Sequence, residues 1–578
     1  MSKLLSVEGV SIDIGQGSNK KRVVESLSFT LDKRQTLCIA GESGSGKSLS
    51  TLAIMGLLPK VATVPQGAII FDNQDLISLN ERKMQQIRGN DIAMIFQEPM
   101  TSLNPLMTAG NQLIEAIRAH QFISVTDAKR VAMTMLDAVK VPQAEKRFKQ
   151  YPHEMSGGMR QRIMIAMALA CQPKILIADE PTTALDVTIQ AQILQLLREL
   201  QQDFDTGVLM ITHDMGVVAE MADDVVVMNR GVVEEHALIE PLFTAPQSLY
   251  TQSLLAAVPK LGHAKPLEPV SASENLLQVK DLTVRFAMKK PWLSRDYQQV
   301  RAVEKVSFSI KPGETLGLVG ESGCGKSTTG RALMNLQAFQ GSAILDGVEL
   351  NNLKGQQLKS MRKNIQMIFQ DPYASLNSRK TIAALLSEPL LLHNIATEKN
   401  CKEHIIKLLN QVGLEADAMD RYPHQFSGGQ RQRISIARAI ASQPKLIIAD
   451  ESVSALDVSV QAQVLELLQQ LQRDLGISYL FISHDMAVVE QICHRVAVMH
   501  GGQIVEMGPR DQIMQSPKHS YTQRLLSSVP IAEIRPKRDL KLVLSDHETT
   551  DPIKMSSHRA EPIMYDKHDN DHLVAINY

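Results

Sequence analysis

Cysteine is scarce in this sequence and is scattered along it. The five cysteines are an odd number, and they form neither a CxxC pair nor a closely spaced cluster. Such a pattern does not indicate a disulfide framework or a zinc site of the usual spacing. A reducing compartment such as the cytosol therefore fits the chain best.

Long apolar runs and an excess of charge are also missing. No apolar run approaches the roughly 20 residues that a helix needs to cross a bilayer. We expect no signal peptide, because the start, MSKLLSVEGV, has no charged head followed by a long apolar core. The formal net charge of -1 gives no global field that would attract nucleic acid or an anionic bilayer.

The chain of 578 residues carries the same pattern twice. Four residues of the first half recur in the second at an offset of 271 to 279 residues: Lys47 at Lys326, Gln97 at Gln370, Asp179 at Asp450, and His213 at His484. A period this long indicates two whole domains, each with its own core, and not a solenoid.

Composition sets the predicted domain limits. We predict a first domain over residues 1–262, a linker over 263–275, a second domain over 276–535 and a polar tail over 536–578. Pro, Ser, Ala and charge replace the apolar periodicity in the linker. The tail has little to pack, and we expect it to be disordered or loosely docked.

Strand and helix patterns alternate within each half. The runs TLCIA, KILIAD and GVLMITH are β-rich, whereas IQAQILQLLRELQQ has the apolar spacing of a helix. This order predicts an α/β fold with a parallel sheet.

Two glycine-rich loops each follow a β-rich run. The sequence GESGSGKS covers Gly41–Ser48, and GESGCGKS covers Gly320–Ser327. Such a loop points backbone N–H groups at phosphate oxygens, its lysine neutralises phosphate, and its last serine offers a hydroxyl to Mg²⁺. A chance glycine-rich turn is the alternative, but the loop occurs twice in the same context. The predicted phosphate-binding residues are Gly41, Ser43, Gly44, Gly46, Lys47, Ser48, Gly320, Ser322, Gly323, Gly325, Lys326 and Ser327.

Two adjacent carboxylates end each of the apolar runs KILIADE and KLIIADE. Asp179 and Asp450 are predicted to bind the metal ion, either directly or through water. Glu180 and Glu451 are the predicted general bases for an attacking water. An Asp-Glu pair alone is often only a solvated strand end, so the loops upstream decide the interpretation.

A Ser-Gly-Gly turn leads into a helical pattern in each half, in MSGGMRQR and in FSGGQRQR. A helix that starts in this way offers an anion-binding N-terminus, although an ordinary capped helix start is the alternative. The repetition at matching positions favours the binding function.

These motifs, taken in order with a glutamine loop, an ALD loop and a switch histidine, resemble the ATP-binding cassette family over nearly all of both halves. The resemblance implies two tandem P-loop NTPase domains, each with a helical subdomain that carries the Ser-Gly-Gly signature. It also implies two ATP molecules with Mg²⁺, each held between one cassette's P-loop and the other's signature. Tethering raises the effective concentration of each half, so pairing within one chain is expected.

The residues implied for each site follow from their matches to the family motifs. The first site combines Lys47, Ser48, Gln97, Asp179, Glu180 and His213 with Ser427, Gly428, Gly429 and Gln430. The second combines Lys326, Ser327, Gln370, Asp450, Glu451 and His484 with Ser156, Gly157 and Gly158. The implied Mg²⁺ ligands are Ser48, Gln97, Asp179, Ser327, Gln370 and Asp450, while Asp186 and Asp457 join the halves. Both sites are expected to hydrolyse ATP.

A few positions depart from the family pattern. Met159 stands where the common signature has Gln, and we expect this change to tune the site without abolishing it. Ser452 and Val453 replace the Pro-Thr that follows the first Asp-Glu pair, and Cys324 occupies a variable P-loop position. Tyr297 is the candidate for stacking on adenine in the second half, with Trp292 as the second choice. The first half has no aromatic there, so we expect looser adenine binding at the first site.

The closing segments PLFTAPQSLYTQSLLAAVP and IMQSPKHSYTQRLLSSVP resemble the peptide and nickel import subfamily. The resemblance implies the motor of a bacterial importer of glutathione or another small peptide, on the cytoplasmic face of the inner membrane. Its partners would be two permease subunits and a periplasmic binding protein, with no nucleic acid. Cysteines of the kind that ligate an iron–sulfur site in some importers of this subfamily follow neither closing segment, so no iron–sulfur cluster is expected. The alternatives are import of dipeptides, oligopeptides or peptide-like compounds, and a soluble twin-cassette factor acting on ribosomes or DNA.

Overall fold

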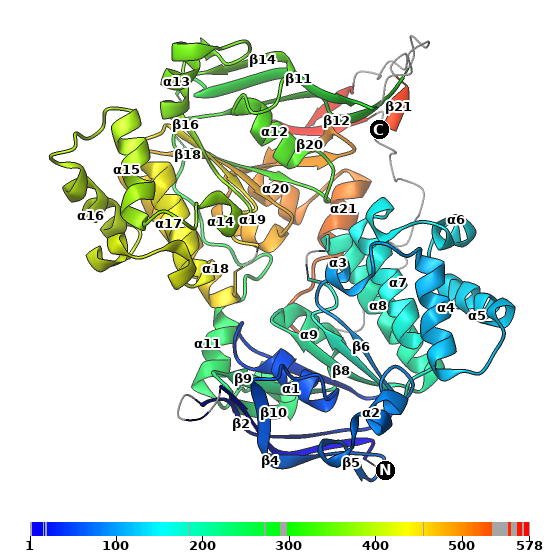
Figure 1. The fold of residues 1–578 in the computed structure, drawn as a ribbon. Helices are drawn as coiled ribbons and strands as arrows, with labels where there is room; N and C mark the ends of the chain where they lie inside the picture. The colour runs from blue at the N-terminus through cyan, green and yellow to red at the C-terminus, as the bar shows by residue number, and fades with distance from the viewer. Residues whose placement is uncertain are drawn as a thin grey trace. The chain divides into compact units, whose positions relative to one another are not determined.

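A computed structural model gives the fold of the chain (Figure 1). The residues that it describes are 3–15, 17, 20–183, 185–270, 273–288, 297–454, 456–534, 553–555, 563–568 and 571–576. The chain divides into two compact units, the first built mainly from Met1–Leu185 and Ile189–Val258 and the second mainly from Pro259–Val529.

The core of the first unit is a six-stranded sheet with the order β10-β9-β3-β8-β7-β6. Neighbouring strands run parallel except for β10, which is antiparallel to β9. The runs TLCIA, KILIAD and GVLMITH are confirmed as β3, β7 and β8, and all residues of these strands are buried. The bounds are β3 (Thr36–Ala40), β6 (Ile92–Ile95), β7 (Ile175–Asp179), β8 (Gly207–Thr212), β9 (Asp224–Asn229) and β10 (Val232–Leu238).

Residues of the core strands alternate between two hydrophobic layers. On β3, Leu37 and Ile39 pack toward an antiparallel sheet, whereas Cys38 and Ala40 pack toward helices. Burial on both faces explains why these strands are continuously apolar. The antiparallel sheet has the order β2-β1-β4-β5, with β1 (Leu5–Ile14), β2 (Lys21–Leu31), β4 (Ala62–Phe71) and β5 (Gln74–Asp75).

The helices of the first unit cover the core sheet and build a separate helical part. Helices α4, α5 and α7 lie side by side in this part (Figure 1). The described helices are α1 (Lys47–Ile54), η2 (Leu76–Ser78), α2 (Glu81–Ile87), α3 (Pro99–Ser102), α4 (Ala109–His120), α5 (Val125–Ala138), α6 (Ala144–Phe148), η3 (Pro152–Glu154), α7 (Gly157–Leu169), α8 (Val187–Phe204), α9 (Met215–Met221), α10 (Ile239–Thr244) and α11 (Leu249–Ala257). Because α7 begins at the Ser-Gly-Gly turn, the predicted helical subdomain with its signature is present.

The second unit repeats this plan with two larger sheets. Their orders are β15-β14-β11-β12-β21 and β16-β17-β18-β13-β19-β20-β23-β22. The strands are β11 (Leu277–Ala287), β12 (Gln298–Ile310), β13 (Thr315–Val319), β14 (Gln340–Leu345), β15 (Val348–Glu349), β16 (Ile365–Ile368), β17 (Leu446–Asp450), β18 (Ser478–Ser483), β19 (Arg495–His500), β20 (Gln503–Pro509), β21 (Ile553–Met555), β22 (Tyr565–His568) and β23 (His572–Ala575).

The helices of the second unit follow the same order as those of the first. They are α12 (Lys326–Leu333), α13 (Gly355–Asn364), α14 (Pro372–Ser375), α15 (Ile382–Leu392), α16 (Cys401–Gln411), η4 (Ala416–Asp420), η5 (Pro423–Gln425), α17 (Gly428–Ile440), α18 (Val458–Leu475), α19 (Met486–Ile492), α20 (Arg510–Gln515) and α21 (Ser520–Ser527). The sequence prediction of a duplicated α/β domain is thus confirmed.

The C-terminal tail differs from the expectation that it has little to pack. Strand β23 pairs with β20 of the core sheet, and β22 pairs with β23. Val574 and Ala575 are buried, and the His572 side chain, also buried, contacts the Glu506 carboxylate. A short apolar run, HLVA, is enough for this pairing because the edge of β20 supplies backbone partners.

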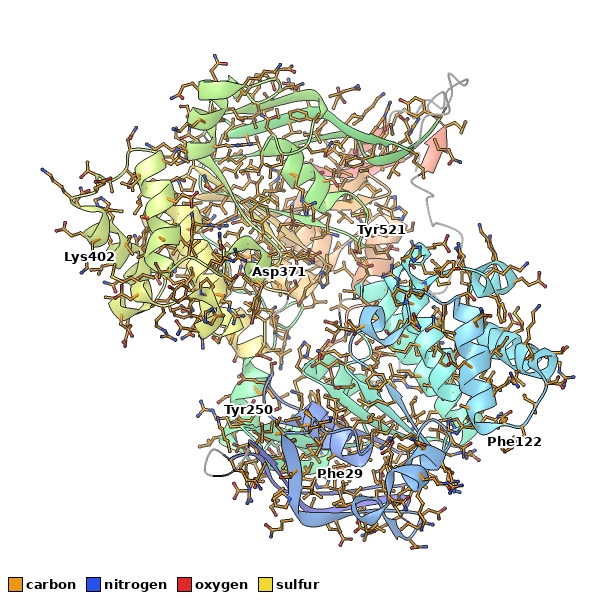
Figure 2. The ribbon with its side chains drawn as sticks, in the orientation of Figure 1. Phe29, Phe122, Tyr250, Asp371, Lys402 and Tyr521 are labelled. Atoms are coloured by element: carbon orange, nitrogen blue, oxygen red, sulfur yellow. The ribbon has the colours of Figure 1, made fainter. Side chains whose placement is uncertain are left out.

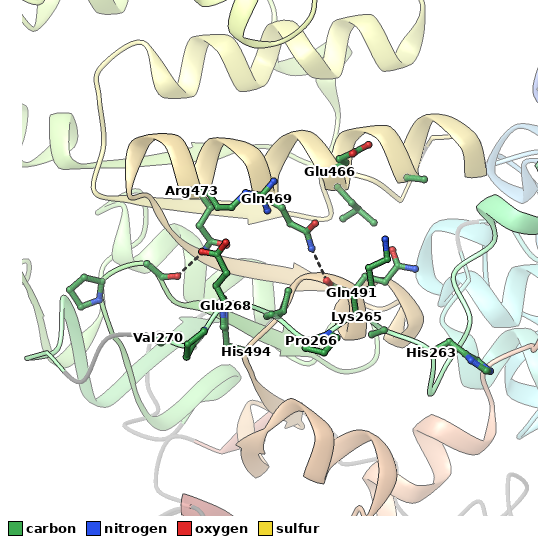
Figure 3. A pocket seen from close by; sticks show the side chains of 18 residues that line it. His263, Lys265, Pro266, Glu268, Val270, Glu466, Gln469, Arg473, Gln491 and His494 are labelled. Atoms are coloured by element: carbon green, nitrogen blue, oxygen red, sulfur yellow. Dashed lines mark hydrogen bonds between the residues drawn. The ribbon is translucent and has the colours of Figure 1, made fainter.

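The described part of the predicted linker lies on the second unit (Figure 3). Gly262, the last residue of the predicted first domain, donates its N–H to both oxygens of the Glu490 carboxylate, at 2.8 and 3.0 Å, and the Arg510 guanidinium donates to the Lys265 carbonyl of the linker at 3.2 Å. Linker residues 263–270 and helix α18 line a cavity of about 790 Å³. Among the residues that the structure describes, we find no helix with the length and apolarity needed to cross a membrane.

Candidate active site

Each glycine-rich loop joins a buried strand to a helix. Gly46 precedes α1 with φ of 94° and Gly325 precedes α12 with φ of 107°, a conformation that favours glycine. The first glycine of each loop lies against backbone: a Cβ on Gly41 would lie 2.0 Å from the Met228 carbonyl oxygen. The loops therefore keep the tight turn that a phosphate cradle needs. Gly320 is the equivalent fixed start of the second loop, and the remaining predicted loop residues, Ser43, Gly44, Ser322 and Gly323, lie between the fixed ends.

The loop lysines are buried and folded back over their own loops. Lys47 Nζ donates to the carbonyls of Gly41 and Glu42, each at 2.8 Å. Lys326 makes the same pair of bonds in the second loop, at 2.7 and 2.9 Å. A buried cation held by loop carbonyls suits a phosphate, because a lysine binds a phosphate oxygen through a charge-assisted hydrogen bond.

The serine after each lysine faces the aspartate at the end of a core strand. Ser48 Oγ donates to Asp179 Oδ1 at 3.0 Å, and Ser327 Oγ donates to Asp450 Oδ1 at 2.7 Å. Burial raises the pKa of the Asp179 carboxyl to about 6, and the Ser48 bond offsets this only in part. Burial raises the pKa of Asp450 as well. A hydroxyl and a carboxylate in contact are hard oxygen ligands, so both pairs fit Mg²⁺.

The glutamate after each aspartate has a strained backbone. Glu180 has φ of 47° and Glu451 has φ of 45°, in the left-handed region that residues with a side chain rarely adopt. Strain of this kind costs of order 1–3 kcal/mol and persists where the surrounding structure enforces it, often at functional sites. Strain at both equivalent positions supports the prediction that these two carboxylates are functional.

The Glu180 carboxylate accepts bonds from three side chains. Gln97 Nε2 lies 2.8 Å from Oε2, Thr183 Oγ1 lies 2.8 Å from Oε2, and His213 Nδ1 lies 3.1 Å from Oε1. Burial alone would raise the pKa of Glu180. The bond and charge of His213, aided by Thr183, outweigh burial and lower that pKa to about 2. The predicted glutamine, glutamate and histidine are thus brought together.

The second carboxylate is held in a related but different way. Gln370 Nε2 lies 2.6 Å from Glu451 Oε2, and His484 Nδ1 lies 3.4 Å from Oε1. Ser454, at the position of Thr183, donates to the backbone carbonyl of Glu451 at 3.0 Å. Burial would raise the pKa of Glu451, but His484 lowers it, and Glu451 in turn raises the pKa of His484 against the effect of burial.

The two signatures begin helices whose N-termini differ in one bond. Ser156 Oγ accepts from the Met159 N–H, and Ser427 Oγ accepts from the Gln430 N–H, each at 3.4 Å. The Gln430 side chain also accepts from the Ser427 N–H at 3.1 Å, a bond that Met159 has no oxygen to make. The glycines of the first turn, Gly157, Gly158, Gly428 and Gly429, are retained. The substitution therefore removes half of a capping box and keeps the helix start.

The other predicted positions lie near ends of elements. Tyr297 directly precedes β12, whereas Trp292 lies outside the described residues. Asp186 directly precedes α8, and Asp457 directly precedes α18. The roles of these residues stay predictions.

Sequence reasoning missed a pair of glutamates, half-buried Glu235 on β10 and buried Glu506 on β20, that hold the closing segments. Glu506 accepts from the N–H groups of Lys518 and His519, at 2.7 and 3.2 Å. Glu235 accepts from Gln247 and Ser248 in the same way, at 2.9 and 3.0 Å. A glutamate recurring 14 residues before the first residue of the closing helix in each half was the signal that could have revealed them.

Asp179→Asn is expected to stabilise the first unit by about 1–3 kcal/mol at pH 7.5 in buffer without nucleotide or Mg²⁺. The reason is that burial raises the pKa of Asp179 to about 6, so the ionised group is costly above that pH. The gain should shrink as the pH falls from 7.5 to 5, because the wild-type carboxyl then takes up its proton. Thermal unfolding across this pH range measures the effect.

The control is Asp203→Asn on the exposed part of helix α8. It should leave the unfolding temperature unchanged at both pH values. Destabilisation by Asp179→Asn at pH 7.5, or a gain that is as large at pH 5, would show that burial of the charge is not the cause.

Comparison with known proteins agrees with this geometry. A family model described as ABC transporter matches residues 24–183 and 303–454, and one described as oligopeptide/dipeptide transporter, C-terminal region, matches residues 505–557. The chain is 50% identical over 582 residues to the glutathione import ATP-binding protein GsiA of Pectobacterium atrosepticum, covering 96% of this chain and 93% of that protein. It is 51% identical to the protein of that name from Escherichia coli K12, covering 94% and 92%.

Among solved structures, an ATP-binding cassette determined as a dimer in a post-hydrolysis state with ADP and Pi is 27% identical. The match covers 41% of this chain and 98% of that chain, with a TM-score of 0.37. The two family-model matches, and relatives at half identity over nearly the whole chain, settle the family. The chain therefore belongs to the ABC transporter family and is an ABC-type ATPase with two cassettes.

Proposed function

We propose that this chain is the ATP-hydrolysing motor of a bacterial importer for small peptides, with glutathione as the first candidate cargo. One observation carries the proposal: both units hold a complete set of lysine, serine, aspartate, glutamate, glutamine and histidine, and the second set is followed by an oligopeptide transporter C-terminal region. The cargo rests on the printed names of relatives that match over nearly the whole chain.

The residues divide the work of nucleotide hydrolysis among them. Bound Mg²⁺ would neutralise the charge of the β- and γ-phosphates, held by Ser48 with Asp179 and by Ser327 with Asp450. The loop lysines would leave their carbonyl partners for phosphate. Glu180 and Glu451 would orient and polarise the attacking water, and His213 and His484 would hold these carboxylates in place.

The glutamines link each site to the segment that follows it. Gln97 Nε2 donates to Glu180, so the metal ligand that Gln97 would offer is its amide oxygen. The segment after it contains α3 and the exposed side chain of Leu106, and the equivalent segment after Gln370 contains α14 and the exposed Tyr373. Large side chains exposed in the segment that follows each glutamine suit contact with two permease subunits.

The composite arrangement of the sites is part of the proposal. Each ATP would lie between the P-loop of one cassette and the signature of the other, with the pairing made within one chain. A periplasmic binding protein would deliver the cargo, and the chain would lie at the cytoplasmic face of the inner membrane. The exposed Phe122 lies between α4 and α5 in the helical part (Figure 2). It does not belong to the segments that follow Gln97 and Gln370.

Single Glu180→Gln and Glu451→Gln variants are each expected to lower ATP turnover, because each removes one water-orienting carboxylate. The double variant should lose turnover about a hundredfold or more while it still binds ATP. Phosphate release by the purified chain measures turnover, and the matched control is Glu199→Gln, at a partly exposed position of α8. If either single variant keeps wild-type turnover, its site is not hydrolytic.

Uptake of labelled glutathione and, separately, of a labelled dipeptide tests the cargo. Cells that lack the gene should take up glutathione only when complemented with the wild type, and not with the double Glu→Gln variant. Lost dipeptide uptake with unchanged glutathione uptake would keep the importer and reject glutathione. Unchanged uptake of both would reject the proposed import of small peptides.

A further inference from the structure

The closing helix of the second unit touches the phosphate loop of the same unit. Tyr521, on α21, places its Oη 3.0 Å from the backbone nitrogen of Glu321 and accepts that N–H. The tyrosine is 1% exposed, and its ring stacks on His500 with 4.1 Å between ring centroids. Its position on α21 can be followed in Figure 2.

The peptide that Tyr521 holds belongs to the loop's fixed start. Gly320, the residue before Glu321, packs so tightly that a Cβ would lie 2.1 Å from the Met499 carbonyl oxygen. The Glu321 carbonyl accepts from Lys326 Nζ at 2.9 Å. The N–H of Glu321 is thus fixed by the closing helix, and its carbonyl holds the lysine that is to meet phosphate.

The closing helix is itself anchored to the core sheet. Glu506 on β20 is fully buried and accepts the N–H groups of Lys518 and His519, which lead into α21. The C-terminal strand adds a third bond to the same carboxylate, because His572 Nε2 lies 2.7 Å from Glu506 Oε1. The His572 ring lies against Gly508, where a Cβ would approach it to 3.1 Å.

We propose that the C-terminal region positions the second nucleotide site, with Tyr521 as the positioning residue and β23 as the strand that secures its helix. The contacts run from His572 to Glu506, then through α21 to Tyr521 and the Glu321 peptide. The proposal rests on nucleotide binding by the second cassette, and it holds for any cargo. It gives the closing segment a task beyond packing: a change in the C-terminal strand alters the affinity for ATP at the second site.

The test measures nucleotide binding in the full chain. A Lys47→Ala background weakens the first site, and binding of a fluorescent ATP analogue, with and without Mg²⁺, then reports the second. Tyr521→Phe should raise the Kd about threefold to tenfold, because it removes the hydroxyl oxygen and leaves the Glu321 N–H without its partner. His572→Ala should raise the Kd by about twofold to threefold, since it loosens the support of α21 only indirectly.

Tyr479→Phe is the matched control. Tyr479 is equally buried and donates its hydroxyl to the Leu468 carbonyl at 3.1 Å, in the core. Its loss should lower the unfolding temperature and leave the Kd unchanged. Added Mg²⁺ is not expected to restore the wild-type Kd in Tyr521→Phe, because the bond that this variant loses lies at the start of the loop and not at the metal ligands.

Each possible outcome tests a different part of the proposal. Equal Kd values for wild type and Tyr521→Phe, both folded, overturn the positioning role of Tyr521. An unchanged Kd in His572→Ala overturns the part assigned to β23, and this variant still tests the contact path if Tyr521→Phe fails to fold. Absence of binding by the Lys47→Ala chain itself would instead contradict nucleotide binding by the second cassette, which is a different failure.

Discussion

Burial of parallel strands on both faces is the constraint on which both active sites depend. The carboxyl ends of parallel strands meet at one edge of a sheet, and β3 and β7 both end there with β8 between them. The P-loop leaves β3, the Asp179–Glu180 pair ends β7, and His213 follows β8. Groups that are far apart in the sequence therefore meet, and the contact of Ser48 with Asp179 is the direct result.

Both units keep this arrangement, but some of the contacts around it differ between them. Both units retain the lysine held by two loop carbonyls and the glutamate with a strained backbone. They differ in the side chain three residues after each glutamate. Thr183 donates to the Glu180 carboxylate, whereas Ser454 donates to the backbone carbonyl of Glu451. The two candidate sites thus share these groups and differ in the hydrogen bonds made by the glutamate.

The sequence predicted most of the fold and of the site because both depend on local rules. Continuous apolar runs such as KILIAD signal strands buried on two faces, and a P-loop needs its glycines and lysine at fixed spacing. The contact of Tyr521 with Glu321 and the pairing of β23 with β20 were not predictable in this way. They join segments whose spacing follows no motif, and the short run HLVA is hidden among polar residues of the tail.

The central claim is that one chain completes two composite nucleotide sites. The most direct measurement is the number of ATP molecules retained per chain by the Glu180→Gln, Glu451→Gln double variant, together with its mass by sedimentation in the same sample. The account predicts two ATP per chain in a particle of the mass of one chain. One ATP per chain, or two only in a particle of twice that mass, would contradict it.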